Sequence, residues 1–195
     1  MFIELTDHLR CPADHAESYL VLLPDEMRER SVRTGRLGCP VCGRTYALAD
    51  GVLDLGGGSE EPPAATLLGA DALTALIGLS GSGGWLVLVG RPAAEWRGVA
   101  ERNRGVGLVA VNPPAAVLDE PGISVLRAAA LPLKSRSMRG VVLGAPYGGD
   151  PIWVGEATRV VLPGLRVAGE GPVPDPAMLE LMAAAGGAWV GTPRR

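Results

Sequence analysis

Short, fully apolar runs alternate with longer amphipathic segments over the C-terminal two thirds of this 195-residue chain. A short continuous apolar run is typical of a strand that is buried on both faces of a parallel sheet. Alternation of such strands with helices predicts an α/β fold, in which helices cover both faces of a mostly parallel sheet. Ligands of such sheets bind at the carboxyl ends of the strands.

The pattern places each expected element. The expected strands are Trp85–Val89, Val106–Val111, Ile123–Leu126, Gly140–Leu143, Arg159–Val167 and Ala188–Val190. The expected helices are Thr66–Leu79, Pro92–Asn103 and Pro176–Ala185, the last of which would stop at Gly186 and Gly187. The uncharged stretch Ala72–Gly90 is interrupted by glycines, so it is predicted to be helix, turn and strand and not a membrane span.

The chain divides into two parts of different composition. Residues 1–55 hold all three cysteines and both histidines, and residues 56–65 are rich in Gly, Pro and Glu. We therefore expect a small N-terminal domain, a linker over residues 56–65 and a second domain over residues 66–195. The N-terminal sequence lacks the pattern of a signal peptide, and three cysteines cannot all pair within one chain, so a reducing, cytoplasmic, bacterial setting is expected.

Composition excludes several classes of function. The net charge of −3 argues against a general nucleic-acid-binding surface. Because no His or Cys follows Cys42, the second domain cannot build a Ser-His-Asp or Cys-His hydrolase alone. The single lysine, Lys134, lies in no phosphate-binding loop. A cluster of arginines could contact RNA or an acidic partner, but neighbouring acids favour a solvated, ion-paired face. That cluster comprises Arg28, Arg30, Arg33 and Arg36.

The N-terminal cysteines have the spacing of a metal site. Cys39 and Cys42 form a Cys-x-x-Cys turn, which can hold half of a tetrahedral zinc site, and Cys11 is a third ligand. His15 is the preferred fourth ligand, because zinc prefers an imidazole nitrogen when thiolates dominate; Asp14 and His8 are the alternatives. The zinc would be structural, stabilising a small domain. The competing interpretation is a remnant of a lost site with free cysteines.

These residues also resemble a known family. The pattern Leu9-Arg-Cys-Pro, the later Cys39-Pro-Val-Cys42 with Tyr46, and the closing Asp50-Gly-Val resemble the zinc-ribbon proteins that activate tRNA, rRNA and release-factor methyltransferases. The sequence departs from that family at Asp14, where Cys is usual, and at Leu53, where Pro is usual. Family members dock on a methyltransferase through a strand edge. The resemblance therefore implies a protein partner, either another chain or the second half of this one.

Residues 66–195 resemble the class I S-adenosylmethionine-dependent methyltransferases, which implies a Rossmann-like fold. Its first to fifth strands would be carried by Val87–Gly90, Leu108–Asn112, Leu126–Leu133, Ser137–Leu143 and Glu156–Gly164. The segment Val52–Gly58 also resembles the glycine-rich cofactor motif, but its distance from Cys42 places it in the closing strand of the zinc ribbon, followed by the linker.

The positions that would bind the cofactor are Gly90, Asn112 and Ala129, and they are eroded. Arg91 and Pro92 add bulk after the first strand, and Asn112 replaces the acid that takes the ribose hydroxyls. Ala128 and Ala129 stand where an acid near the adenine is common, and Arg139 replaces an acid on the fourth strand. Tyr147 is either an ordinary turn residue or a stacking surface. If the side chain of Arg91 or Trp85 filled the pocket between Gly90, Asn112 and Ala129, that would favour a pseudoenzyme.

Three functions follow from these patterns. The leading hypothesis is a methyltransferase-derived, non-catalytic binding or assembly protein with a structural zinc. The second is an active S-adenosylmethionine-dependent methyltransferase acting on a small molecule, RNA or protein, since methyl transfer needs mainly proximity and alignment. The third is a zinc-ribbon RNA-binding module, motivated by the arginine cluster.

Overall fold

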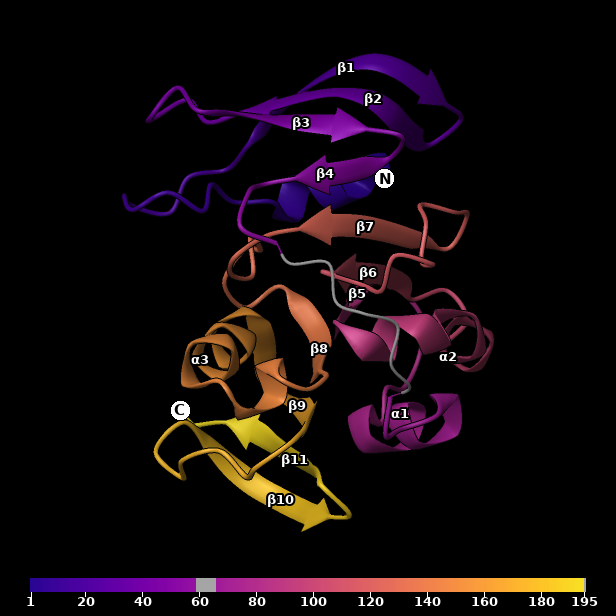
Figure 1. The fold of residues 1–195 in the computed structure, drawn as a ribbon, viewed down its shortest axis with the longest axis vertical. Helices are drawn as coiled ribbons and strands as arrows, with labels where there is room; N and C mark the ends of the chain where they lie inside the picture. Colours follow the sequence, from indigo (N-terminus) through magenta and orange to yellow (C-terminus); the bar gives the residue numbers. More distant parts are fainter. Residues whose placement is uncertain (59–65, 195) are drawn as a thin grey trace.

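A single sheet runs through the whole molecule in the computed structural model, which describes residues 1–58 and 66–194 (Figure 1). The predicted linker residues 59–65 lie outside the described part. Among the described residues the sheet has eleven strands. In spatial order they are β1 (Val21–Arg28), β2 (Ser31–Gly38), β3 (Thr45–Ala49), β4 (Val52–Asp54), β7 (Ile123–Arg127), β6 (Gly107–Val111), β5 (Trp85–Val89), β8 (Met138–Leu143), β9 (Val161–Glu170), β11 (Ala188–Pro193) and β10 (Leu179–Ala185).

The centre of the sheet is parallel and both of its flanks are antiparallel. Strands β4, β7, β6, β5, β8 and β9 are paired in parallel, each with its neighbour. Strands β1 to β4 form an antiparallel meander on one flank, and β9, β11 and β10 are antiparallel on the other. The prediction of an α/β fold is confirmed. The sheet was predicted to be mostly parallel, but only its centre is parallel, and with its two antiparallel flanks the sheet is mixed.

Helices cover both faces of the parallel centre (Figure 1). Helices α1 (Ala70–Ile77) and α2 (Trp96–Arg102) pack on one face, and α3 (Pro151–Val160) packs on the other. The position of β5 between the two helical layers explains why its sequence is continuously apolar. Leu86 and Leu88 face the layer of α1 and α2, whereas Val87 and Val89 face the layer of α3. Short 3-10 helices cover Ile3–His8, Arg91–Glu95 and Tyr147–Gly149. Within the described ranges, no helix is long and apolar enough to cross a membrane.

One predicted helix is wrong. Residues 176–185 were expected to be helical, yet Leu179–Ala185 forms strand β10 and pairs with β11. Gly186 and Gly187, which the prediction used as a helix stop, both have positive φ (59° and 79°) and make the tight turn of a hairpin. The pairing with β11 therefore overrides the helical propensity of a segment rich in Ala, Leu and Met.

Helix α3 and the hairpin β1–β2 were not predicted from the sequence. Asp150 caps α3, because its carboxylate accepts a hydrogen bond of 2.8 Å from the Ile152 amide, and Pro151 occupies the first turn. The strand expected at Arg159–Val167 therefore begins two residues later, at Val161, and Arg159 belongs to the helix. The expected helix 92–103 is divided into a 3-10 turn and α2.

The N-terminal lobe, residues 1–55, joins the rest of the molecule through strand β4. Val52, Leu53 and Asp54 pair in parallel with the three residues Val125, Leu126 and Arg127 of β7. Leu53 is fully buried in a hydrophobic core that both parts of the chain share. Ion pairs reinforce the junction: Arg33 lies 2.8 Å from Asp119, and Arg10 lies 3.0 Å from Glu156. This pairing also confirms that Val52–Asp54 is the closing strand of the lobe.

The shared core predicts that the two parts unfold together. Leu53→Ala removes a fully buried side chain from β4 and should lower the free energy of unfolding by about 2–5 kcal/mol. All four tryptophans lie beyond residue 80, but Trp85 packs against Phe2 and His8 of the lobe. The measurement is therefore made in a Trp85→Phe background, in which tryptophan fluorescence during urea unfolding reports the second part. Leu23→Ala, at a β1 side chain that is 53% exposed, is the matched control and should change little. An unchanged tryptophan transition in Leu53→Ala would contradict a shared core.

Candidate functional site

Two loops of the N-terminal lobe bring three cysteines and one histidine together. The first loop contains Cys11 and His15 and is closed by a 2.8 Å hydrogen bond from the Cys11 amide to the Ser18 carbonyl. The second is the turn between β2 and β3, in which the Cys39 amide donates to the Arg44 carbonyl and the Gly43 amide to the Cys39 carbonyl. Both loops end next to paired strand segments, which fix their positions.

The four side chains are close enough together to share one metal ion. Their ligand atoms all lie within 4.8 Å of one another. Cys11 Sγ is 3.8 Å from Cys42 Sγ, and Cys39 Sγ is 3.4 Å from His15 Nε2. Zinc bonds of about 2.3 Å to sulfur and 2.0 Å to nitrogen give a tetrahedron with edges of about 3.8 Å and 3.5 Å. The cluster could therefore hold a metal ion such as zinc.

The histidine ring is oriented for this role by its own backbone neighbour. His15 Nδ1 lies 2.7 Å from the Ala16 carbonyl oxygen, to which it donates a hydrogen bond. That bond raises the pKa of His15 and leaves Nε2 facing the sulfur atoms. A ligating histidine is commonly held in this way, because the outer hydrogen bond fixes both the tautomer and the ring orientation.

Backbone dipoles in the second turn favour a thiolate. Burial opposes ionisation of Cys39, but hydrogen bonds from the amides of Cys42 and Val41 outweigh it and lower the pKa of Cys39 from 9.0 to about 6. Tyr46 lies beside the cluster, with its hydroxyl 3.3 Å from Cys11 Sγ, and burial raises the pKa of Tyr46 to about 12. A neutral phenol can therefore donate to the Cys11 sulfur without adding negative charge to the site.

The two alternative ligands lie elsewhere. Asp14 is exposed and does not belong to the group of converging ligand atoms. His8 packs with its ring against Trp85, the centroids being 6.3 Å apart, and burial lowers its pKa. Of the three candidates for the fourth ligand position, the structure brings only His15 to the cysteines.

The three predicted cofactor positions lie side by side at the carboxyl edge of the sheet. Gly90, Asn112 and Ala129 follow the adjacent strands β5, β6 and β7. Gly90 has φ of 70° and donates from its amide to the Val111 carbonyl at 2.9 Å. Topology therefore brings together the residues that the sequence pattern singled out.

The Asn112 side chain is bound to the protein itself. Its Nδ2 donates to the Ala128 carbonyl at 2.7 Å, and its Oδ1 accepts from the Ala128 amide at 2.9 Å. Asn112 has a positive φ of 49° and is only 1% exposed. Asparagine tolerates this conformation better than most residues. Because the amide is enclosed and paired at both of its polar atoms, it cannot reach a ligand without breaking this pair.

The chain leaving β4 lies over the same place. A Cβ atom built on Gly58 would lie 2.6 Å from Asn112 Oδ1 and 3.0 Å from the Ala128 amide nitrogen. A Cβ atom on Gly57 would lie 2.7 Å from that of Ala129. Such approaches leave no room for a side chain, so glycine is required at both positions. The backbone of residues 57 and 58 thus packs against Asn112, Ala128 and Ala129, where the sequence resemblance would place the adenosine group.

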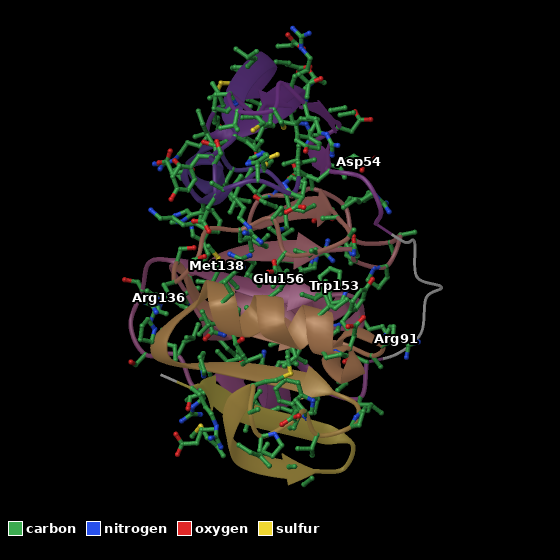
Figure 2. All side chains as sticks on the ribbon, turned by 90° about the vertical axis from the view of Figure 1, so that its left-hand side faces the viewer. Asp54, Arg91, Arg136, Met138, Trp153 and Glu156 are labelled. Carbon is green, nitrogen blue, oxygen red and sulfur yellow. The ribbon has the colours of Figure 1, made fainter. Side chains whose placement is uncertain are left out.

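The described residues at this edge do not fit S-adenosylmethionine in the arrangement that the structure shows. Its ribose would need an acceptor at the end of β6, but Asn112 is enclosed and paired. Its adenine would need the surface that Gly57 and Gly58 cover. Pro92 is buried in the turn after β5, and Arg91 lies at this same edge in Figure 2. Trp85 is at the opposite end of β5 against Phe2, so it does not fill this pocket.

Sequence reasoning missed Glu170, which ends strand β9 at this edge and is only 1% exposed. Its carboxylate accepts hydrogen bonds from the Leu67 amide at 2.9 Å, from the Leu68 amide at 3.3 Å and from the Thr66 hydroxyl. The other oxygen accepts from the Ala145 amide at 3.4 Å. Glu170 therefore anchors the start of the second part of the chain to the sheet edge. The signal that could have identified Glu170 in the sequence is an acidic residue at the end of an apolar strand.

Two further expectations have structural outcomes. Tyr147 is buried and packs edge-on against Trp153, with ring centroids 4.6 Å apart, so it is not an open stacking surface. The arginine cluster lies on the β1–β2 hairpin and beside it, and three of its members are ion-paired. These pairs are Arg28 with Glu26, Arg30 with Glu4 and Arg33 with Asp119. The solvated, ion-paired interpretation of the cluster is confirmed for Arg28 and Arg30, whereas Arg33 pairs with the buried carboxylate of Asp119.

Comparisons with known proteins give similarity only at the level of structure. No family model matches the sequence, and no curated protein matches it. One similar structure is the complex between the Haloferax volcanii Trm112 methyltransferase activator and a candidate methyltransferase, at 17% identity over 46% of this chain and 45% of that chain, with a TM-score of 0.39. Another is a candidate sarcosine dimethylglycine methyltransferase from Galdieria sulphuraria, at 14% identity over 55% and 48%, also with a TM-score of 0.39. The chain spans about half the length of these structures.

Cobalt binding tests whether His15, and not Asp14 or His8, completes the cluster of three cysteines. Co²⁺ added to the apo-protein should give the visible absorption of a tetrahedral thiolate site with one ion per chain. His15→Ala and Cys42→Ser should weaken binding at least about 10-fold, because each removes a ligand. His8→Ala is the matched histidine control, and Asp14→Asn tests the other alternative; neither should change the spectrum. Loss of the spectrum in Asp14→Asn but not in His15→Ala would contradict the assignment.

Proposed function

We propose that this chain is a methyltransferase-derived protein that has lost S-adenosylmethionine binding and acts as a non-catalytic binding or assembly partner. The observation that carries the proposal is the enclosed pair between the Asn112 amide and the Ala128 backbone, over which Gly58 lies. The groups that would take the ribose and the adenine are engaged within the protein. A buried hydrogen-bonded pair of this kind is costly to open, since each unpaired group would cost about 1–3 kcal/mol.

The order of the strands supports descent from the class I methyltransferases. The strands that the sequence resemblance numbers first to fifth are β5, β6, β7, β8 and β9, and they lie in the order third, second, first, fourth, fifth. This is the order of the doubly wound nucleotide-binding sheets. Their ligands bind at the point where the strand order reverses, next to the first and fourth strands. We infer a Rossmann-like second domain over residues 66–195 that retains this scaffold.

The N-terminal lobe supports the same proposal. We infer that Cys11, His15, Cys39 and Cys42 hold a structural zinc, because the four ligands are protein side chains and the cluster stabilises loops outside the sheet edge. Strand β4 of this lobe occupies the free edge of β7. The lobe therefore binds the methyltransferase-like domain of its own chain in the way that the activator family binds a separate one. Another protein would have to dock elsewhere.

Cofactor titration tests the proposal directly. Isothermal titration calorimetry of the zinc-loaded protein with S-adenosylmethionine and S-adenosylhomocysteine should show no binding in the micromolar range, because residues 57 and 58 cover the site. Micromolar binding that Asn112→Ala weakens would overturn the proposal and support the alternative, an active methyltransferase. The Asn112→Ala variant must first be shown by circular dichroism to be folded under the same conditions.

Substitutions at Asn112 provide a second test that does not use a cofactor. Asn112→Asp restores the acid of the methyltransferase pattern, but an ionised carboxylate cannot donate to the Ala128 carbonyl and would repel it. We expect Asn112→Asp and Asn112→Ala each to lower the free energy of unfolding by about 1–3 kcal/mol. Urea unfolding measures this change, and Asn103→Ala, at the buried asparagine that follows α2 as its C-cap, is the control for amide loss. A stabilising Asn112→Asp substitution would mean that position 112 is built to present an acid.

A further inference from the structure

A cavity of about 790 Å³ lies at the amino edge of the sheet, opposite the cofactor edge. It is bounded by the end of α3, the starts of β8 and β9 and the end of β11. Its lining residues are Ser135, Arg136, Thr158, Arg159, Val161, Pro163, Met178, Pro193 and Arg194. Figure 2 shows Arg136 and Arg91 on opposite sides of the molecule, so this cavity is separate from the predicted cofactor site.

The charge of this cavity is one-sided. Among its described lining residues three are arginines and none is acidic, in a chain whose net charge is −3. Glu156 already neutralises Arg159 through bonds of 2.8 Å and 2.7 Å. Within the described ranges, Arg136 and Arg194 make no ion pair with an acidic side chain. Two guanidinium groups therefore face the cavity rim without a protein counter-ion, which favours an anionic ligand.

The backbone of the rim around Arg136 is held in place. Arg159 donates to the carbonyls of Leu131 and Leu133 at 3.0 Å and 2.8 Å, which fixes the loop before Arg136 against helix α3. The Arg136 amide in turn donates to the Arg159 carbonyl at 2.9 Å. Arg136 has a positive φ of 52°, a conformation that costs a non-glycine residue about 1–2 kcal/mol. The surrounding bonds hold this arginine in a conformation that local preference disfavours.

Four of the lining residues are apolar. They are Val161, Pro163, Met178 and Pro193, and we call this part of the cavity its floor. A bare anion would use only the rim, and a neutral hydrocarbon would use only the floor. We propose that this cavity binds a small organic anion, a phosphate or carboxylate group attached to an apolar body, with Arg136 and Arg194 contacting the anionic group. The site goes beyond the proposed function and does not depend on the cofactor edge.

Nuclear magnetic resonance titration of the full, zinc-loaded chain tests the site with four probes. Phenyl phosphate and benzoate carry both halves of the proposed ligand, inorganic phosphate carries only the charge, and phenol carries only the ring. Amide shifts should map to residues 135–137, 158–162 and 194, and one or both organic anions should bind more tightly than phosphate and phenol. The stronger of the two organic probes identifies the anionic group. Equal affinity of phosphate and phenyl phosphate together with weak benzoate binding, or shifts outside these residues, would overturn the proposal.

Variants of the rim and floor make the assignment specific. Arg136→Ala and Arg194→Ala should each weaken binding of the better organic probe by about 3- to 10-fold, as expected for loss of a charge-assisted contact at a partly exposed site. Arg28→Ala removes an exposed arginine from β1 and is the control for net charge. Met178→Ala should weaken the organic probe but not inorganic phosphate. Equal effects of Arg136→Ala and Arg28→Ala would show a general electrostatic attraction and would overturn the site.

Discussion

The parallel pairing of β4 with β7 determines how the rest of the molecule is arranged. Only three residue pairs form it, yet it turns two sheets into one and allows a single hydrophobic core to extend through both parts of the chain. Without it, β7 would be an edge strand with unpaired backbone groups, and so would β4. The lobe therefore covers an edge that a parallel sheet would otherwise expose.

The sequence predicted the parts of this fold that are determined locally. Strand β5 was placed correctly because a strand buried on both faces needs an uninterrupted apolar run. The cluster of Cys11, His15, Cys39 and Cys42 was predictable because metal chemistry restricts both the residue types and their spacing. In contrast, residues 179–185 form a strand only because β11 pairs with them, and no local signal reports that pairing.

The candidate cofactor site shows the same limit more sharply. The sequence identified Gly90, Asn112 and Ala129 as neighbours at the strand ends, and the topology brings them there. It could not indicate that the Asn112 amide would pair with the backbone of Ala128, sixteen residues away, because that depends on the register between β6 and β7. Nor could it distinguish glycines that bind a cofactor from glycines that allow close packing, since both need the same absence of a side chain.

The pairing of β4 with β7 and the covered cofactor edge have a common cause. Parallel strands end at the same edge of a sheet, so a chain that leaves β4 must emerge beside the carboxyl end of β7. Leu55 continues the pairing by donating to the Arg127 carbonyl at 2.8 Å, and the next residues pass over Ala128, Ala129 and Asn112. An activator-like lobe on a separate chain could leave this edge in any direction. A lobe fused ahead of the domain must send its connection toward the second part, and in this chain residues 57 and 58 of that connection lie against the ends of β6 and β7. Under the proposed function, fusion of the lobe in this order is therefore itself a physical reason for the loss of cofactor binding.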